Sequence, residues 1–324
     1  MCTRLFRQLR TTKSAASLIF LQSTSATLKG GDRTVNRNGH DSEANGQLSP
    51  RLEHDGVVVL APDDVLRTLR AVRDPVTTTI LDPWYNKGVG GIQEDYHEWL
   101  ATVLCAAADV SEHVFLWGYP EIIHRTLDYL PDGCNLVAWL TWYYKNCPSV
   151  IRGWRSAQMT CLHIARDGAK LYPEHFLSES QLELKRQKKL RYMPGPPSVI
   201  ETALLVGFVG RAEQTGHPAQ KPAGAIEPLI KMTTTEGDLV LDPMCGSGTT
   251  GVVCRSLGRR AILCDSAEEY IAMTEQRLQV KRLNSEGFAA LRAGTLFTNS
   301  MQQPANVTYQ RAKTGEDQPR LMGG

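Results

Sequence analysis

The chain has 324 residues, of which 42% are hydrophobic, enough to bury the core of one large α/β domain or two small ones. Its eight cysteines are scattered, with no C-x-x-C pair and no neighbouring histidine cluster, which argues against a zinc site and for reduced, mostly buried thiols. No apolar run approaches the roughly 18 residues that a membrane-spanning helix requires.

The net charge of +2 hides an uneven distribution along the chain. Residues 1–31 contain no acidic residue and five basic ones (Arg4, Arg7, Arg10, Lys13 and Lys29). Without these five, 31 basic residues face 34 acidic ones, a net charge of −3. Any contact with nucleic acid therefore has to come from a local basic cluster.

Residues 1–50 are expected to lie outside the fold. Arginines recur at helical spacing in the first ten residues, and serine and threonine dominate the segment from there to Asp32, a composition typical of organelle transit peptides. We therefore expect import into the mitochondrion; the alternative is a disordered basic tail on a nuclear or cytoplasmic protein. Residues 32–50 read as a linker.

Strands and helices alternate from Gly56 onward. Three apolar or β-branched runs read as strands (57–60, 76–81 and 114–117). Three further segments read as helices (63–70, 94–109 and 121–130), and the acids Asp63 and Asp64 can cap the first of them. Apolar strands that alternate with helices form a mostly parallel sheet covered on both faces, so the pattern predicts a doubly wound α/β fold.

The second of these strands ends in a group of chemically active residues, Asp82-Pro83-Trp84-Tyr85-Asn86-Lys87-Gly88. Ligands bind at the strand ends of α/β sheets. A carboxylate, a main-chain acceptor and a flat ring together suit a planar amine such as a nucleobase. The alternative interpretation is a strand followed by a turn with two core aromatics.

Two further runs, 136–144 and 158–165, read as antiparallel strands at the sheet edge. The first contains four aromatic residues that fit a buried core better than a base pocket (Trp139, Trp142, Tyr143 and Tyr144).

Residues 146–216 have the weakest pattern and read as a substrate-recognition insert. Within them, 185–191 places five positive charges in seven residues (Lys185, Arg186, Lys188, Lys189 and Arg191). This run is the best candidate for contact with nucleic-acid phosphates, although such a run can also be a solvated helix face.

A second motif comes after another apolar strand, at 239–241. The strand ends in Asp242 and Pro243, a glycine-rich turn contains Gly246, Ser247 and Gly248, and a helix begins near Thr249 and Thr250. The next strand ends in Asp265, where an acid can hold ribose hydroxyls. Because no lysine follows the glycines, as a phosphate-binding loop requires, the pattern favours a nucleoside with an amino-acid tail, S-adenosylmethionine, over a polyphosphate.

Three motifs together resemble the β group of DNA amino-methyltransferases, which methylate N6 of adenine or N4 of cytosine. The run from Asp82 resembles the D-P-P-Y catalytic motif, His217-Pro218-Ala219-Gln220-Lys221-Pro222 resembles H-P-T-Q-K-P, and 242–250 resembles the cofactor motif. They occur in the permuted order of that group, and the likeness covers about residues 56–280. One departure is Trp84, which stands where the family has its second proline.

The resemblance implies a Rossmann-like methyltransferase domain over 51–284. The composition of residues 285–324, with Gln302, Gln303, Pro304 and a terminal Gly-Gly, predicts a disordered tail. It implies that Asp82 and the Pro83 carbonyl accept the N–H groups of a flipped-out base while Tyr85 and Trp84 stack on it. It further implies that S-adenosylmethionine is held by the 242–250 loop, Asp82, Asp265, Lys221 and one of Asp63 and Asp64, of which we select Asp63. His217 is interpreted as structural.

DNA is the expected partner, RNA the alternative, and no metal is expected. Asp82 favours adenine over cytosine, because the family has Asp at this position for adenine and Ser for cytosine. A cytosine-C5 enzyme would need a Pro-Cys nucleophile, whereas Cys147-Pro148 has the reverse order. An inactive nucleic-acid-binding homologue stays open, although the acids at 82, 242 and 265 argue against decay.

Overall fold

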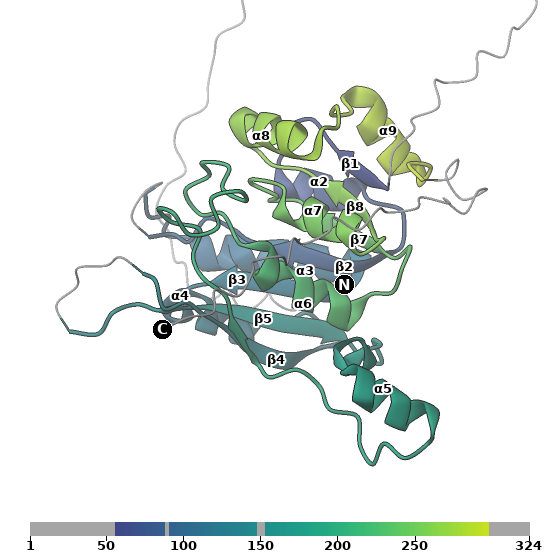
Figure 1. Ribbon diagram of the computed structural model, residues 1–324. Helices are drawn as coiled ribbons and strands as arrows, with labels where there is room; N and C mark the ends of the chain where they lie inside the picture. Colours follow the sequence, from purple (N-terminus) through teal and green to yellow (C-terminus); the bar gives the residue numbers. More distant parts are fainter. Residues whose placement is uncertain (1–55, 88–90, 148–152, 298–324) are drawn as a thin grey trace, which may run out of the picture.

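The computed structural model describes residues 56–87, 91–147 and 153–297, so the predicted transit peptide and linker at 1–50 lie outside the described residues. Eight strands in these ranges form one sheet in the order β1-β8-β7-β2-β3-β5-β4-β6 (Figure 1). Their bounds are β1 Val57–Val59, β2 Val76–Leu81, β3 Ser111–Gly118, β4 Cys134–Tyr143, β5 Gln158–Arg166, β6 Val199–Glu201, β7 Leu239–Asp242 and β8 Arg260–Leu263. All neighbouring pairs are parallel except the two that β5 forms with β3 and β4.

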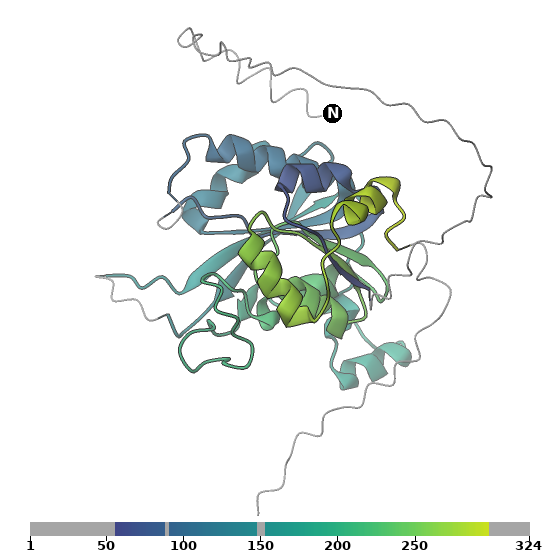
Figure 2. The same ribbon diagram turned by 90° about the horizontal axis from the view of Figure 1, so that it is seen from above.

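Helices cover both faces of the sheet, as Figures 1 and 2 show. One face carries α2 (Val65–Ala71), α3 (Tyr96–Val110) and α9 (Ser285–Ala293). The other carries α6 (Ala223–Thr233), α7 (Thr249–Ser256) and α8 (Glu268–Leu278). The shorter segments are α4 (Pro120–Ile123), α5 (Glu179–Arg186) and the 3₁₀ turns His124–Tyr129 and Pro173–Phe176.

The strand side chains alternate between the two helical layers. In β7, Val240 packs in the layer of α6, α7 and α8, whereas Leu239 and Leu241 pack in the layer of α2 and α3. The same alternation separates Ile80 from Leu81 in β2. Because both faces are buried, these strands are apolar throughout, which is why their sequences read as continuous hydrophobic runs.

The chain reverses its winding between β2 and β7, which are parallel neighbours. From β2 the chain proceeds to β3 on one side, and from β7 it proceeds to β8 on the other. Ligands of open α/β sheets bind outside the carboxyl ends of the strands at such a switch point. Asp82 follows β2, Asp242 ends β7, and Asp265 follows β8, so three acids meet at this edge.

The predicted doubly wound, mostly parallel sheet is confirmed, and three details differ. Only β5 runs antiparallel, and β6 rather than β4 forms the edge. The helix predicted at 121–130 is one short α-helix continued as a 3₁₀ turn. The domain does not end at residue 284, because α9 follows and buries Leu291 in the core.

Most of the described cysteines are buried, as the sequence predicted. Five of the seven described ones are buried, and none of the seven forms a disulfide bond (Cys105, Cys134, Cys147, Cys161, Cys245, Cys254 and Cys264). No helix within the described ranges combines the length and apolarity that crossing a membrane requires.

Candidate active site

A cavity of about 720 Å³ opens at the switch point, and both predicted motifs line it. This volume lies within the roughly 300–1,000 Å³ of small-molecule sites. The wall residues come from the end of β2, the segment before α6, the β7–α7 loop and the start of α8. Segments about 160 residues apart in sequence are therefore joined in one site. Its polar and aromatic wall includes Asp82, Trp84, Tyr85, Tyr119, His217, Gln220, Lys221, Asp242, Ser247, Thr249, Thr250, Asp265 and Tyr270.

Asp82, Tyr85 and Lys221 form a closed hydrogen-bonded cluster. Lys221 Nζ lies 2.5 Å from Asp82 Oδ2 and donates to the Tyr85 hydroxyl at 2.6 Å. That hydroxyl donates to Asp82 Oδ1 at 2.7 Å. The Lys221 side chain is 5% exposed and that of Asp82 20%, so the pair is largely withdrawn from water. The ammonium also lies over the rings of Tyr85 and Trp117, at 5.3 and 5.4 Å from their centroids.

Burial raises the pKa of Tyr85 well above its ordinary value, and the neighbouring Asp82 carboxylate raises it further. Tyr85 is therefore a neutral hydroxyl at physiological pH. Its ring packs edge to face on Tyr119 with centroids 5.2 Å apart. The motif thus presents a carboxylate and an aromatic ring in fixed positions.

The departure at Trp84 is accommodated by α3. The Trp84 ring packs edge to face on Tyr96, with centroids 5.6 Å apart, and the Tyr96 hydroxyl donates to the Trp84 carbonyl at 2.6 Å. Trp84 also lines the cavity. The tryptophan therefore forms part of the cavity wall while α3 fixes its backbone.

The β7–α7 loop is held by buried side chains. Asp242 Oδ1 accepts from the Met244 N–H at 3.1 Å, and Oδ2 accepts from the Thr250 hydroxyl. Burial raises the pKa of Asp242 to about 7, although these two hydrogen bonds act against the increase. Gly248 has φ of 74°, and a Cβ there would lie 2.8 Å from Thr274, so only glycine fits this turn.

Asp265 closes the other side of the loop. Its Oδ2 accepts from the Gly246 N–H at 2.9 Å and its Oδ1 accepts from the Ala267 N–H at 3.0 Å. Each carboxylate oxygen has a further lone pair. Because Asp265 lines the cavity, its carboxylate can accept hydrogen bonds from the hydroxyl groups of a ligand and still keep those from the Gly246 and Ala267 N–H groups.

These residues fit a nucleoside with an amino-acid tail. The Asp265 carboxylate is an acceptor for ribose hydroxyls, and the glycine turn with the N-terminus of α7 offers N–H groups to a carboxylate. Pro243, Met244, Ile226 and Tyr270 supply apolar wall for a base. The donors and acceptors therefore match S-adenosylmethionine.

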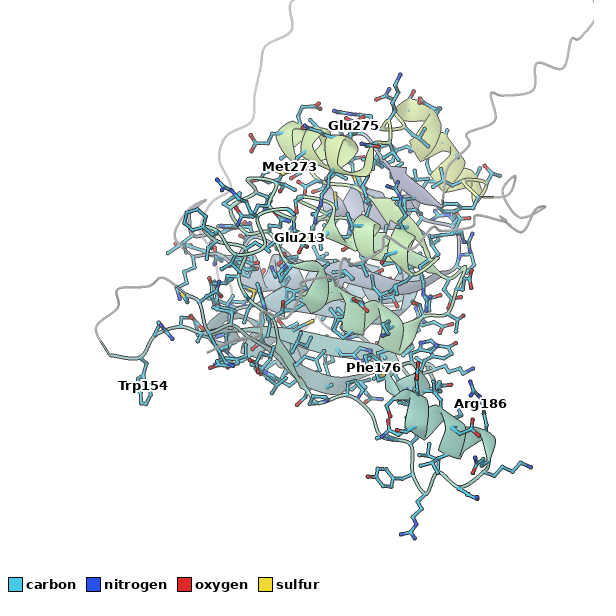
Figure 3. The ribbon with its side chains drawn as sticks, in the orientation of Figure 1. Trp154, Phe176, Arg186, Glu213, Met273 and Glu275 are labelled. Atoms are coloured by element: carbon cyan, nitrogen blue, oxygen red, sulfur yellow. The ribbon has the colours of Figure 1, made fainter. Side chains whose placement is uncertain are left out.

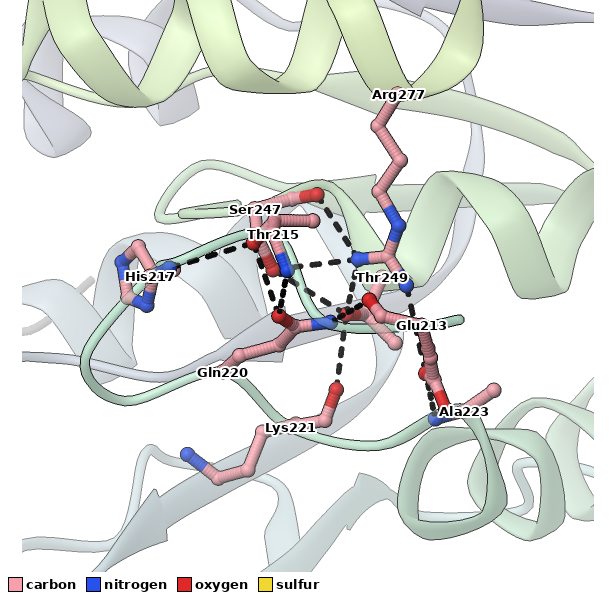
Figure 4. A network of polar contacts seen from close by, with 9 residues as sticks. All are labelled: Glu213, Thr215, His217, Gln220, Lys221, Ala223, Ser247, Thr249 and Arg277. Carbon is pink, nitrogen blue, oxygen red and sulfur yellow. Dashed lines mark hydrogen bonds and ion pairs between the residues drawn. The ribbon is translucent and has the colours of Figure 1, made fainter. Parts of the chain in front are cut away.

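A polar network joins the cofactor loop to the segment before α6 (Figure 4). Arg277 of α8 donates to the Ser247 carbonyl at 3.0 Å and to the Thr249 hydroxyl at 2.9 Å, and it pairs with Glu213 at 3.4 Å. The Thr249 hydroxyl in turn donates to the Lys221 carbonyl at 2.9 Å. One arginine thus connects the β7–α7 loop with the lysine that contacts Asp82.

The structure brings together most of the predicted site residues and refines two assignments. Asp64, rather than the predicted Asp63, lines the cavity and also caps α2; Asp63 instead forms an ion pair with Arg67. Lys221, predicted in the cofactor pocket, has its ammonium in the cluster with Asp82 and Tyr85.

The predicted phosphate-binding run lies elsewhere. Lys185 and Arg186 occupy the last turn of α5, and Lys188, Lys189 and Arg191 follow; all five are exposed. Figure 3 shows Arg186 at the end of the molecule opposite Trp154 of the β4–β5 hairpin. The run therefore does not border the cavity. The aromatic residues of β4 do not line it either, and Trp142 and Tyr144 are buried.

Sequence reasoning missed several wall residues. His217 lines the cavity beside Gly246 and packs against Tyr270, with ring centroids 4.3 Å apart, so it forms part of the cavity wall. The H-P-x-Q-K-P motif could have indicated His217 and Gln220. Tyr119 and Tyr270 of the wall lie outside the motifs and gave no signal, and the same holds for Arg277, which supports the β7–α7 loop. No cluster of metal-binding side chains occurs in the part of the chain that the structure describes.

Comparison with known proteins agrees with this geometry. Residues 76–276 match the DNA methylase family of N6 and N4 methyltransferases. The type II methyltransferase M.HpaI of Haemophilus parainfluenzae is 30% identical over 216 residues, which cover 61% of this chain and 67% of that relative. The DNA adenine methyltransferase YhdJ of Escherichia coli is 43% identical over 68 residues, 21% of this chain and 23% of the relative.

Solved structures share the fold. The M1.HpyAVI complex with S-adenosylmethionine superposes with a TM-score of 0.55 at 20% identity, covering 69% of this chain and all of that one. The cytosine-N4-specific PvuII methyltransferase gives 0.53 at 18% identity, covering 74% and 94%. The resemblance carried by the three motifs is thus confirmed, and the chain belongs to the N6/N4 DNA methylase family, whose members are S-adenosylmethionine-dependent DNA methyltransferases.

Proposed function

We propose that this protein methylates the exocyclic N6 amine of adenine in DNA. The observation that carries the proposal is the meeting of the Asp82 motif and the β7–α7 loop in one cavity at the switch point. Base acceptor and cofactor loop then lie side by side, which direct transfer between two bound molecules requires.

Within this site, the residues act by alignment and electrostatics. Bound S-adenosylmethionine supplies an electrophilic methyl group on a sulfonium. Asp82 and the Pro83 carbonyl accept the two N–H groups of the base amine, which raises electron density on nitrogen and fixes its direction. Tyr85 and Trp84 hold the base plane. Lys221 keeps the Asp82 carboxylate in place through its 2.5 Å contact.

The depth of the cluster supports base flipping. Pro83 is buried and the Asp82 side chain is 20% exposed, so a base stacked inside a duplex cannot reach them. The target nucleotide must leave the helix to bind, as enzymes that modify bases require.

Adenine is favoured by Asp82 and by one relative. Asp is the residue that the family has at this position for adenine, and YhdJ, which is 43% identical over 68 residues, is named a DNA adenine methyltransferase. A carboxylate is also the stronger acceptor for the amine N–H groups than a serine hydroxyl.

The test is product identification. The full chain is incubated with labelled S-adenosylmethionine and unmethylated DNA, the DNA is digested, and the nucleosides are identified by mass spectrometry. N6-methyladenine is the expected product. N4-methylcytosine would overturn the base assignment, and label in RNA alone would overturn the substrate.

We further propose that residues 1–50 direct the chain to the mitochondrion. The support is their composition, with five basic and no acidic residues in the first 31. Sequencing the N-terminus of the protein isolated from cells tests this: removal of the segment is expected, and an intact N-terminus would contradict it.

A further inference from the structure

The loop between β6 and α6, whose C-terminal part lines the cavity, exposes an aromatic residue. Phe208 at its tip is 87% exposed, and its neighbours Val206 and Val209 are exposed as well. An apolar tip on a surface loop is unfavourable in water unless something covers it.

The tip is held in a defined shape. The Gln214 amide donates to the carbonyls of Gly207 and Val209 at 3.1 and 2.7 Å, and the Glu213 N–H donates to the Gly210 carbonyl at 2.8 Å. The loop therefore has a defined shape that exposes Phe208, because the side chain of Gln214 and the N–H of Glu213 form hydrogen bonds with carbonyls of the loop itself.

Both ends of the loop are anchored to the site. At its start, Leu204 and Asn146 of the β4–β5 hairpin exchange two hydrogen bonds of 2.8 Å. At its end, Glu213 accepts from the Ala223 N–H at 2.7 Å and pairs with Arg277 (Figure 4). Seven residues later, Gln220 lines the cavity.

Charge favours a polyanionic occupant. Arg211 lies 5.5 Å from the centroid of the Phe208 ring, and no carboxylate within the described ranges forms an ion pair with it. A second exposed aromatic, Trp154, is 98% exposed on the β4–β5 hairpin. That hairpin and the β6–α6 loop lie at the same end of the molecule in Figures 1 and 2, away from α5.

We infer that Phe208 enters the duplex where the target base has left it, with Arg211 on the adjoining phosphate; this rests on the proposed function. A flipped base leaves a gap between two neighbouring bases, and an aromatic ring on a fixed loop fills it by stacking. Apolar wedges of this kind stabilise an opened base step. Phe208 is thus a positioning residue that holds the duplex open rather than a group that touches the reacting atoms.

The test compares the full-length wild type with Phe208→Ala, Phe208→Trp and the matched control Tyr192→Ala, which removes another exposed aromatic (76% exposed) beside the distant basic run. The probe is a short duplex with the site that the wild type methylates, with 2-aminopurine at the target base. Base–aromatic stacking predicts a loss of affinity of roughly 5- to 150-fold, and loss of the fluorescence increase, for Phe208→Ala. Phe208→Trp should restore both, and Tyr192→Ala should change neither.

Cofactor affinity should stay unchanged in all four proteins, which excludes a folding defect. Wild-type fluorescence and affinity in a cofactor-binding, monomeric Phe208→Ala protein would overturn the inference while leaving the proposed function intact. A change of oligomeric state on substitution would assign the tip to a second copy of this chain and also overturn it. No methylated nucleoside from the wild type would instead overturn the proposed function, and the inference with it.

Discussion

The contact between Asp82 and Lys221 matters for stability as well as for the proposed transfer. Both groups are charged, and Lys221 is almost completely buried. Removing one partner of a buried ion pair leaves the other charge without compensation. Substitutions of Asp82 and Lys221 are therefore expected to have coupled effects on the free energy of unfolding.

Asp82→Ala should lower the free energy of unfolding by up to about 3 kcal/mol, because the buried Lys221 ammonium loses its carboxylate. The double variant Asp82→Ala, Lys221→Met should regain much of this loss, since no charge is then left unpaired. Urea denaturation of the single and double variants measures both values. If the double variant lost as much stability as the two single variants combined, the proposed coupling would be contradicted.

The pKa of Asp242, raised to about 7 by burial, predicts a pH dependence of stability. The folded protein binds this proton more tightly than the unfolded chain, whose pKa is near 3.9, so the contribution of Asp242 is present at low pH and is lost as the pH rises towards about 7. Asp242→Asn cannot titrate. The wild type should therefore lose stability relative to this variant between about pH 4 and pH 7, measured by denaturation at several pH values. A constant difference would show that Asp242 stays ionised in the fold.

Among the elements, α8 links the two halves of the site through Arg277. The guanidinium holds the Ser247 carbonyl, the Thr249 hydroxyl and Glu213 together. Helix α8 therefore supports the β7–α7 loop through Arg277, while Tyr270 near its start lines the cavity.

Arg277→Met should raise the dissociation constant for S-adenosylmethionine by about tenfold, the loss of a hydrogen bond to a charged group. The affinity of the Asp82 cluster for the base depends on other contacts, so the KM for DNA should change by much less. Glu213→Gln is the matched control, because its amide oxygen can still accept from Arg277 and from the Ala223 N–H. Equal changes in both constants for Arg277→Met would instead indicate general unfolding of the site.

Local sequence predicted the elements that carry the motifs, because the strands β2, β7 and β8 are apolar runs whose ends are marked by Asp82, Asp242 and Asp265. It could not predict which side chains meet. Lys221 contacts Asp82 across 139 positions, and only the packing of α6 against the sheet decides that. Local sequence also could not distinguish Asp63 from Asp64, of which the structure shows that Asp64 caps α2 and lines the cavity.

At the scale of the whole molecule, the basic run at 185–191 lies at the opposite end from the β4–β5 hairpin and the β6–α6 loop. A charge count along the sequence contains no information on which end of a sheet a helix will occupy. The same holds for α9, whose nine residues show no strong sequence signal but pack Leu291 into the core.

Neutralising Lys185, Arg186, Lys188 and Lys189 should therefore leave the affinity for a short duplex of about 15 base pairs within about twofold of the wild type, with the same salt slope. Neutralising Arg211 of the β6–α6 loop and the exposed Arg155, which follows Trp154 on the β4–β5 hairpin, should flatten that slope by about 1.8, the value for two phosphate contacts. DNA-binding titrations at several salt concentrations distinguish these two variants. A flatter slope for the first variant would restore the run as the DNA contact.

The central claim is that the Asp82 motif performs the transfer while the β7–α7 loop holds the cofactor in the same cavity. The most direct measurement is methyl transfer to DNA and S-adenosylmethionine affinity side by side for the wild type, Asp82→Ala and Asp242→Ala. Asp82→Ala should lose at least about 10²-fold in transfer with nearly wild-type cofactor binding, and Asp242→Ala should weaken cofactor binding. Equal loss of transfer and cofactor binding in Asp82→Ala would contradict this division of roles.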